Sequence, residues 1–591
     1  MCGIIGYISS IEYKNHINKN HREKSLNLIK RRGPDSTNSI YFESDSYQVF
    51  LGHTRLAIQD TSSEFNQPYK SKISDNLLVY NGEIYNFSNF PEYSSYSSDT
   101  KVLYDLLSNK KECLSEFDGI FSFGFWDDKE KIFYLARDRF GIKPLFYFYV
   151  KGFLAFSSSL RALNILSNKN FKLNKQYIEE SSEHGYTHNN KTTFSRINKL
   201  NKNTIFSVNP RNWITKKRLI YRNSLNNNSA NKKISLPILR EKIVKSLASQ
   251  ISNSDRGFGF FLSGGTDSSL LVSEATKLNL NSKINTYSLI VPGKNTNEIK
   301  NIQFFKKIMI NSKNITYKNQ IFDEKEIKMA LECFPYLDYP VLDISILPSI
   351  SLCKSVDQDI RVILSGDGAD ELFAGYPRIY HTFWRFLFIN IIPRRIKYFL
   401  IKFFHKKITL CKYLSVNHPL EMRTLLMGAK NLDKKLYKSF KPSFNSIFKQ
   451  IIDYELNFYL PSVLEKVDAA SMFSSLEVRV PFLSNNIIEY MSNISISNII
   501  WQKCTKSFLK KLLALNTCRK YAYSEKIGLT FNKDNQFQFI ISFLESKKYP
   551  LLLNEKIEKG LSKNKLKYIR LLLLKHWLFG FNEEDFKKLD I

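Results

Sequence analysis

The first 222 residues alternate short apolar runs with polar turns, the pattern that half-buried strands produce. Runs of this kind occupy residues 51–60, 77–86, 121–127, 132–138 and 153–156. The runs at 121–127 and 132–138 are predicted to pair as neighbouring strands. The run at 77–86 contains Asn81-Gly82, a pair common in hairpin turns, so we expect the strand to break there.

The second half of the chain alternates apolar runs of strand length with segments of helical period. An amphipathic helix is predicted at 236–251, and strands are predicted at 258–262, 284–291 and 361–364. Alternating strands and helices predict a doubly wound parallel α/β sheet that binds its ligand beyond the carboxyl ends of the strands.

The most apolar segment, at 383–404, is too charged to span a membrane. Six residues interrupt it: Arg385, Pro393, Arg394, Arg395, Lys397 and Lys402. Two readings stay open. The segment lies on an anionic membrane surface, or, as we favour, it forms a basic helical excursion from the core fold.

Length and composition then set the domain organisation. A chain of 591 residues with 43% hydrophobic residues holds two or more globular domains. Residues 223–233 are polar and low in complexity, as linkers are. We predict domains at 2–222 and 236–591, joined by a linker at 223–235.

The net charge of +32 raises the question of a nucleic-acid partner. Lysine is spread along the whole chain, with no arginine-rich tail, so we expect a solvated basic surface and no nucleic acid. The seven cysteines are odd in number and show no C-x-x-C spacing, which fits a reducing compartment. The N-terminus has no signal-peptide pattern, and we expect a cytoplasmic protein without a transmembrane segment.

A glycine-rich turn follows the strand at 258–262. It reads Ser263-Gly264-Gly265-Thr266-Asp267-Ser268 and precedes an apolar run at helical spacing. Glycines allow close approach of the backbone to a ligand, and a helix N-terminus offers N–H groups to phosphate. We expect Asp267 or Ser268 to cap the helix. An ordinary strand–turn–helix corner is the alternative, but the complete motif resembles the pyrophosphate loop of ATP pyrophosphatases.

A second polar loop follows the strand at 361–364. Ser365 and Gly366 come first, and three carboxylates follow within five residues: Asp367, Asp370 and Glu371. Acidic residues also suit a helix start, but carboxylates supply the hard oxygen ligands that Mg²⁺ takes beside phosphates.

The chain opens Met1-Cys2-Gly3-Ile4, and removal of Met1 would expose a cysteine with a free α-amine. The pKa of that amine, about 7.7–8.0, suits a general base for an N-terminal thiol nucleophile. Alternatively, Cys2 merely begins a buried strand.

Four further segments favour the nucleophile: the turn at 31–36, the strand at 51–60, the strand at 77–86, and Ser98-Asp99-Thr100 before a helix that Ser98 or Asp99 would cap. In this order they resemble the class II glutamine amidotransferase domain of the glutamine-dependent asparagine synthetases, an αββα sandwich of the N-terminal nucleophile type. The resemblance implies that Cys2 attacks the glutamine amide, with Asn81 and Gly82 as the oxyanion hole.

The same resemblance implies a glutamine-binding set. Arg55 would grip the α-carboxylate, and Glu83 and Asp99 would hold the amino group and backbone. Leu56 and Ile58 complete the set. Taken singly, Arg55 could be an ordinary ion-pair residue and Asp99 only a helix cap.

The resemblance continues through the second half, where the segments 463–472, 475–483 and 525–529 match synthetase blocks. It implies ATP and Mg²⁺ as cofactors. The implied ATP-binding residues are Leu262, Ser263, Gly264, Gly265, Asp267, Ser268, Leu289, Ser365, Gly366 and Lys506. Asp267 and Asp370 would hold magnesium, and Asp367 would lie beside the acceptor. We expect Glu477 and Arg479 to form a buried structural pair.

The implied reaction is the adenylation of a carboxylate, aspartate in the first instance, followed by amide formation with ammonia from glutamine. Five positions depart from the family pattern: Arg31, Lys101, Asn297, Tyr339 and Ser484. The acceptor therefore stays open between aspartate and another carboxylate, such as a uronic-acid sugar of a surface polysaccharide. An RNA-modifying ATP pyrophosphatase is a more distant alternative, and a homodimer is reasonable for the family.

Overall fold

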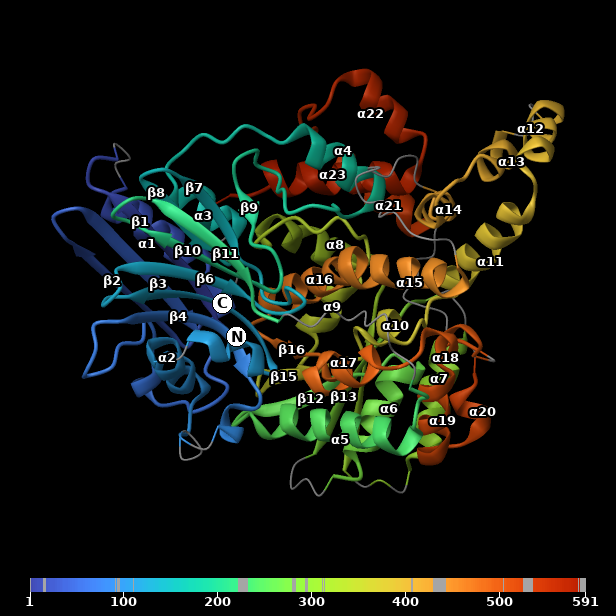
Figure 1. The fold of residues 1–591 in the computed structure, drawn as a ribbon, viewed down its shortest axis with the longest axis horizontal. Coiled ribbons are helices and arrows are strands. Elements are labelled where there is room, and N and C mark those ends of the chain that lie inside the picture. The colour runs from blue at the N-terminus through green and yellow to red at the C-terminus, as the bar shows by residue number, and fades with distance from the viewer. Residues whose placement is uncertain are drawn as a thin grey trace.

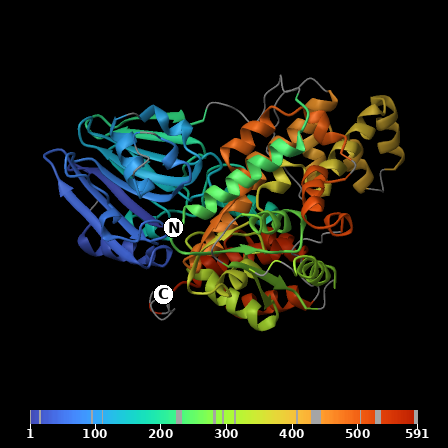
Figure 2. The ribbon, with the colours of Figure 1, turned by 90° about the horizontal axis from the view of Figure 1, so that it is seen from below.

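The computed structural model describes residues 2–13, 17–90, 92, 96–109, 111–221, 232–278, 283–292, 296–310, 312, 314–404, 408–428, 443–502, 504–524, 535–582 and 584. Most of the predicted linker and the block at 525–529 lie outside these residues, as does Met1. Figures 1 and 2 show two α/β halves side by side, the N-terminal half in blue and cyan and the C-terminal half in green to red.

The N-terminal half contains two antiparallel sheets. The first has the order β2-β3-β1-β8-β7-β9 and the second the order β11-β10-β6-β5-β4. The strands of the first sheet are β1 (Gly3–Ser10), β2 (Ser36–Glu43), β3 (Tyr47–Arg55), β7 (Phe146–Val150), β8 (Phe153–Ser157) and β9 (Asn198–Lys199). Those of the second are β4 (Leu77–Ile84), β5 (Gly119–Asp127), β6 (Ile132–Arg137), β10 (Thr204–Asn209) and β11 (Ile214–Leu219).

Helices cover the outer faces of both sheets. They are α1 (Lys19–Leu28) and α3 (Leu160–Leu166) on the first sheet and α2 (Asp99–Asn109) on the second, whereas α4 (Lys175–His184) packs against the C-terminal half. Alternation along β1 explains the layers, since Ile4 and Ile8 lie in the core between the sheets while Ile5 and Tyr7 lie in the core with α1 and α3. The second sheet packs against α2. The predicted αββα sandwich is confirmed.

Two strand predictions need correction. The strand at 77–86 does not break at Asn81-Gly82: β4 continues to Ile84, with Asn81 opposite Ser122 on β5. Gly82 makes this possible, because its φ of 156° and a backbone contact that leaves no room for a side chain both require glycine. The strand predicted at 51–60 ends at Arg55, and the residues that follow form a loop.

The C-terminal half is built on five parallel strands in the order β14-β13-β12-β15-β16. Their bounds are β12 (Gly257–Phe261), β13 (Ile284–Ile290), β14 (Ile315–Ile321), β15 (Ile360–Leu364) and β16 (Glu477–Arg479). The strand order reverses between β12 and β15, which is where a doubly wound sheet binds its ligand. The predicted parallel sheet with helical additions is confirmed.

The helices of this half are α5 (Leu236–Ser252), α6 (Thr266–Ala275), α7 (Thr296–Ile308), α8 (Glu324–Cys333), α9 (Ile346–Lys354), α10 (Ala369–Leu372), α11 (Pro377–Ile391), α12 (Arg394–Phe403), α13 (Ile408–Leu414), α14 (Pro419–Leu426), α15 (Phe444–Tyr454), α16 (Leu460–Phe473), α17 (Asn485–Ser492), α18 (Ile496–Ile500), α19 (Ser507–Asn516), α20 (Arg519–Ala522), α21 (Asn535–Glu545), α22 (Glu555–Ser562) and α23 (Lys565–Phe579). A π-helical turn, Glu455–Tyr459, joins α15 to α16.

The two halves share hydrophobic cores. Leu56, Phe140 and Ile142 of the N-terminal half belong to the same buried cluster as Leu239 and Ile243 of α5. This continuity fixes the position of one half against the other, and so it fixes the two candidate sites as well.

The segment at 383–404 forms the end of α11 and all of α12, which extend from the body as an arm in Figure 1. The helical excursion predicted here is confirmed. Within the described ranges, no helix is both long and apolar enough to cross a membrane.

Candidate active sites

Cys2 lies at the start of β1, buried beside β4. Its backbone nitrogen donates a hydrogen bond to Asn81 Oδ1 at 3.1 Å, and burial raises the pKa of its thiol. The nitrogen that would become the α-amine after removal of Met1 is therefore already held in place by the strand that carries the predicted oxyanion hole.

The side-chain nitrogen of Asn81 is the clearest sign of a ligand site here. Asn81 Nδ2 is buried and has no hydrogen-bond partner among the described residues. A buried donor without a partner costs about 1–3 kcal/mol, so such groups are typical of positions that a ligand satisfies. The donor lies on the same amide as the oxygen that binds the Cys2 nitrogen, which suits an oxyanion forming at the thiol.

Arg55 organises the loop that follows β3. Its Nη1 donates to Asn66 Oδ1 at 2.9 Å and to the Ser62 carbonyl, and its Nη2 donates to the Asp60 carbonyl. The adjacent Leu56 and Ile58 are buried. The guanidinium is thus fixed in orientation at the end of a strand next to Cys2.

Asp99 and Glu83 form a buried acidic pair near this loop. Tyr80 Oη and the Ile84 nitrogen both donate to Asp99 Oδ2, at 2.8 and 3.0 Å. Burial raises the pKa of Asp99 to about 6 and the pKa of Glu83 well above its usual value. Arg479, from β16 of the other half, lies 3.7 Å from Glu83. Arg55, Leu56 and Glu83 are therefore brought close to Cys2, and Asp99 lies near Glu83.

Ser98 caps α2, since its hydroxyl accepts from the Thr100 nitrogen at 3.3 Å. The corresponding prediction for α6 is wrong. The capping residue of α6 is Gly265, no side chain caps the helix, and Ser268 instead accepts from the Ser263 nitrogen at 3.2 Å. The Ser268 hydroxyl holds the loop, which leaves the first N–H groups of α6 for a ligand.

A cavity of about 220 Å³ lies at the switch point between β12 and β15, where the sequence predicts nucleotide binding, and we call it the nucleotide cavity. The predicted residues that line it are Leu262, Ser263, Asp267, Ser268, Leu289, Ser365, Gly366, Asp367 and Asp370. Gly366 is required where the two loops meet, because a Cβ there would lie 2.8 Å from the Asp267 Cβ. Ser365 Oγ donates to Asp367 Oδ2 at 2.5 Å.

Lys506 completes this site from the N-terminus of α19. Its Nζ lies 2.6 Å from Asp267 Oδ2 and also pairs with Asp370. These two carboxylates raise the pKa of Lys506. Gly375 makes room for the arrangement, since a Cβ there would overlap both Asp370 and Lys506.

Some residues of the cavity were not assigned from the sequence. Lys466 on α16 lines it and donates to Ser345 Oγ at 3.0 Å. Glu371 also lines it, accepts from Tyr376 Oη at 2.8 Å, and has a pKa raised to about 8 by burial. Glu371 was included among the carboxylates of the predicted acidic loop, but nothing in the sequence indicated that burial raises its pKa. Glu477 and Arg479 form the expected buried pair, at 2.6 Å.

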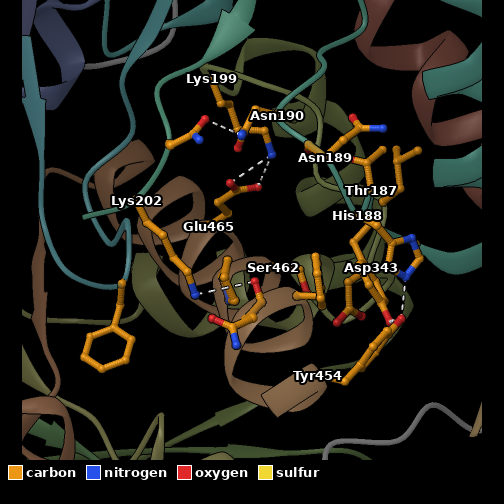
Figure 3. Close-up of a pocket in the computed structure, with 18 of the residues that line it drawn as sticks. Thr187, His188, Asn189, Asn190, Lys199, Lys202, Asp343, Tyr454, Ser462 and Glu465 are labelled. Atoms are coloured by element: carbon orange, nitrogen blue, oxygen red, sulfur yellow. Dashed lines mark hydrogen bonds and ion pairs between the residues drawn. The ribbon is translucent and has the colours of Figure 1, made fainter. Parts of the chain in front are cut away.

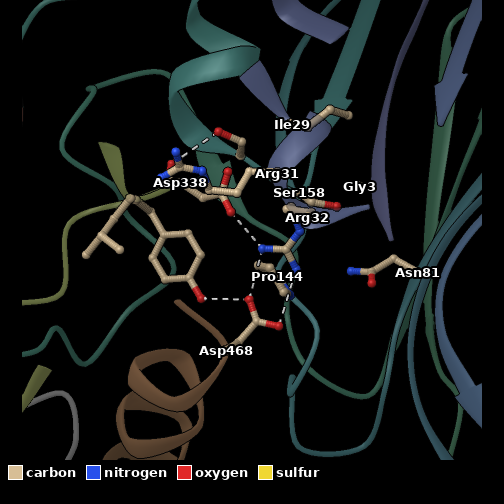
Figure 4. Close-up of polar contacts among 12 residues, drawn as sticks. Gly3, Ile29, Arg31, Arg32, Asn81, Pro144, Ser158, Asp338 and Asp468 are labelled. Atoms are coloured by element: carbon tan, nitrogen blue, oxygen red, sulfur yellow. Dashed lines mark hydrogen bonds and ion pairs between the residues drawn. The ribbon is translucent and has the colours of Figure 1, made fainter. Parts of the chain in front are cut away.

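A buried polar cluster connects the two sites (Figure 4). Arg32 Nε donates to the Cys2 carbonyl at 3.2 Å, while its Nη1 donates to Asp338 Oδ2 at 2.8 Å and to Asp468 Oδ2 at 3.1 Å. Tyr339 Oη also donates to Asp468, at 3.2 Å. Tyr339, one of the departures from the family pattern, is therefore part of the contact between the halves.

A larger cavity, of about 500 Å³, lies at the boundary between the halves (Figure 3). Lys199 Nζ donates to both carboxylate oxygens of Glu465 at 2.9 Å, and His188 lies between Glu180 and the Tyr454 hydroxyl. Its other polar residues include Asn189, Asn190, Asn201, Lys202, Asp343, Asn457 and Ser462.

Helix α16 separates this interdomain cavity from the nucleotide cavity. Ser462 and Glu465 line the first, and Lys466 and Ala470 line the second. Lys466 Nζ lies 4.0 Å from Asp343, which also lines the interdomain cavity. Asp343 and Lys466 therefore connect the walls of the two cavities.

Comparison with known proteins agrees with this architecture. The family model described as a glutamine amidotransferase domain matches residues 1–218, and the model described as asparagine synthase matches residues 238–539. Two Bacillus subtilis proteins named asparagine synthetase [glutamine-hydrolyzing] 1 and 3 are 27% and 25% identical to the chain. The matches cover 86% and 87% of this chain and 84% of each relative. Amidase chyE of Penicillium rubens is 25% identical, over 64% of this chain and 59% of its own length.

A glutamine amidotransferase domain joined to an asparagine synthase domain defines a glutamine-dependent amidotransferase of the asparagine synthetase type. The chain belongs to the asparagine synthase family, whose model matches just over half of it.

Proposed function

We propose that this protein forms a carboxamide from aspartate, using ATP to activate the carboxylate and glutamine as the nitrogen source. The products are asparagine, glutamate, AMP and pyrophosphate. The observation that carries the proposal is the pairing of Lys506 with both Asp267 and Asp370 at the switch point, in a chain whose other half carries a buried N-terminal thiol.

In the first half-reaction, Cys2 attacks the glutamine amide after its α-amine takes the thiol proton. Asn81 Nδ2 stabilises the oxyanion, because it is a preorganised donor with no competing partner among the described residues. Arg55 binds the α-carboxylate, and ionised Asp99 binds the α-ammonium. Ammonia leaves, and water then releases glutamate from the thioester.

In the second half-reaction, the aspartate carboxylate displaces pyrophosphate from ATP. The N–H groups at the start of α6 bind phosphate, and Lys506 neutralises charge on the leaving pyrophosphate. Asp367, held by Ser365, faces the acceptor. Ammonia then attacks the acyl-adenylate and AMP leaves.

Asp267 and Asp370 are the side chains that would hold Mg²⁺. They converge on one cation, Lys506 Nζ, which fits a site for positive charge. In the described part of the chain, no cluster of three metal-binding side chains occurs, so phosphate oxygens would supply the remaining ligands. The metal's contribution is neutralisation of phosphate charge.

The test is product analysis with purified protein, ATP, Mg²⁺ and aspartate, using either glutamine or ammonium as the nitrogen source. We expect asparagine with both for the unaltered chain, and with ammonium alone for Cys2→Ala. Glutamine hydrolysis without asparagine from either nitrogen source would overturn aspartate as the acceptor.

A second candidate acceptor is a larger carboxylate such as a uronic-acid sugar. The interdomain cavity supports it, because about 500 Å³ lined by amide, carboxylate, ammonium and phenol groups exceeds what aspartate needs and suits a polyhydroxylated ligand. Its carboxylate would enter the nucleotide cavity beside Asp343 and Lys466, which lie 4.0 Å apart and line one cavity each. AMP release with glucuronate or galacturonate, in the absence of release with aspartate, would select this alternative.

A further inference from the structure

The arm formed by the end of α11 and by α12 has an apolar face that the rest of the described chain does not cover. Helix α12 has no buried residue. Ile396, Phe399, Leu400 and Phe403 follow the i, i+3, i+4, i+7 spacing of one helical face. Phe399 and Phe403 are 63% and 67% exposed, and their rings stack on each other at 6.1 Å.

The preceding helix also exposes large apolar side chains near its end. Phe388 and Ile391, at the end of α11, are 65% and 74% exposed. The base of α11 is anchored differently, since Ile379, Phe383 and Phe386 are buried in the body. The arm is therefore buried at one end and exposes large apolar side chains at the other. Figures 1 and 2 show its helices at the edge of the molecule.

The charged residues around the apolar face indicate which kind of surface would bind it. The sequence has no aspartate or glutamate between Glu371 and Glu421. Over the same stretch the described basic residues of α11 and α12 outside the base of the arm are Arg385, Arg394, Arg395, Lys397 and Lys402, and Lys412 follows on α13. On α12 they lie away from the apolar face, an arrangement typical of helices that lie in the interface of an anionic bilayer.

A second copy of the chain fits the same face less well. Two arms in contact would bring together two groups of positive charge with no carboxylate between them, which opposes association. Large apolar side chains that are exposed together on one surface nonetheless indicate a binding partner. An anionic lipid surface satisfies both the apolar and the charged residues.

We propose that the arm docks the protein on anionic membranes, with Ile396, Phe399 and Phe403 inserted among the lipids and the basic residues at the headgroups. The consequence for catalysis follows from the base of the arm. Tyr376 lines the nucleotide cavity and directly precedes α11, and Arg378 stacks on it at 3.7 Å. Helix α11 is about 22 Å long at 1.5 Å per residue, so docking would hold the synthetase site close to the membrane surface. This proposal does not depend on which carboxylate is amidated.

The test is flotation of the full chain with vesicles of phosphatidylcholine, alone or with 30% phosphatidylglycerol. We expect binding to the anionic vesicles, weakened by added salt. Arg394→Gln/Arg395→Gln should weaken it by about 25-fold, since each basic residue near an anionic surface contributes about fivefold. Phe399→Glu/Phe403→Glu should weaken it by tenfold or more. Neither pair should lower glutaminase activity or the unfolding temperature, because α12 buries no side chain.

Two controls are matched to these variants. Lys216→Gln/Arg218→Gln removes the same charge from exposed β11, and Ile73→Glu alters an apolar residue that is 97% exposed. Both control variants should bind the anionic vesicles with an affinity within twofold of that of the unaltered chain. Equal loss in control and arm variants, or no preference for phosphatidylglycerol, would overturn the proposal. So would light scattering that shows a dimer which Phe399→Glu/Phe403→Glu converts to a monomer, because the occupant would then be a second copy.

Discussion

Arg32 and Asp468 form a buried ion pair between the two halves, with Nη1–Oδ2 and Nη2–Oδ1 distances of 3.1 and 3.3 Å. Each side chain is 1% exposed. Because Arg32 Nε also binds the Cys2 carbonyl, and Asp468 lies on the helix that carries Lys466 into the nucleotide cavity, one guanidinium contacts elements of both sites.

Removal of one partner of this pair should harm both stability and coupling. Arg32→Met leaves the Asp468 carboxylate buried without its guanidinium, and we expect a loss of about 3–5 kcal/mol in the free energy of unfolding. Amide formed per glutamine hydrolysed should fall, whereas ammonium-dependent synthesis should be less affected. Denaturant unfolding and product analysis measure both.

The matched control for Arg32→Met is Lys559→Met, which breaks an exposed ion pair with Glu555 on α22. It should cost less than about 1 kcal/mol and leave coupling intact. A double-mutant cycle with Asp468→Asn should give an interaction of about 2 kcal/mol or more. Additive effects would contradict the assigned link.

Lys506→Met should abolish ATP-dependent synthesis with either nitrogen source, by about 100-fold or more, while glutamine hydrolysis at Cys2 continues. The reason is that Lys506 is the cation between Asp267 and Asp370. AMP release measures the first effect and glutamate release the second. Lys511→Met, at an exposed position on the same helix, should behave like the unaltered chain, and equal activity of both variants would refute the role of Lys506.

Gly82→Ala tests whether the continuous β4 is required. The added Cβ would lie 2.0 Å from the Ile120 carbonyl oxygen at a φ of 156°. We expect a loss of about 3 kcal/mol or more in stability, with glutaminase activity lost first. Gly560→Ala, which meets no atom within 4 Å, is the control and should leave the unfolding temperature unchanged or raise it. Full glutaminase activity in Gly82→Ala would show that β4 tolerates a break.

Glutamine hydrolysis should fall as the pH drops below about 6. Burial raises the pKa of Asp99 to about 6, so below that pH the side chain is neutral and no longer attracts the α-ammonium. The value of kcat/KM for glutamine should then fall about tenfold per pH unit. The Asp99→Asn variant should have a low kcat/KM for glutamine at every pH, without the fall below about pH 6. The folded state binds the Asp99 proton more tightly than the unfolded state, so this carboxylate lowers stability as the pH rises from about 4 to 6.

The sequence predicted most reliably those parts of the sites whose residues are close together in the chain. Ser263, Asp267 and Ser268 are close together in the chain, so a single strand–turn–helix motif brought them to the nucleotide cavity together. The contact of Lys506 with Asp267 joins residues 239 positions apart. The family resemblance assigned Lys506 to ATP binding, but it did not suggest this pair. No periodicity indicates such a contact.

The pair of Arg32 with Asp468 was missed for the same reason, with 436 positions between its members. The break expected at Asn81-Gly82 failed because pairing with β5 outweighs the local turn preference of Asn-Gly. The cap expected from Ser268 failed because its hydroxyl has a competing partner in the loop.

The most direct test of the central claim, that the two halves act as one amide-forming enzyme, is transfer of nitrogen from [amide-¹⁵N]glutamine in the presence of excess unlabelled ammonium, with ATP, Mg²⁺ and aspartate. We predict that asparagine carries the label for the unaltered chain, carries none for Cys2→Ala, and forms together with an equal amount of AMP. Asparagine whose label matches that of the bulk ammonium, or glutamate release with no AMP at all, would contradict the account.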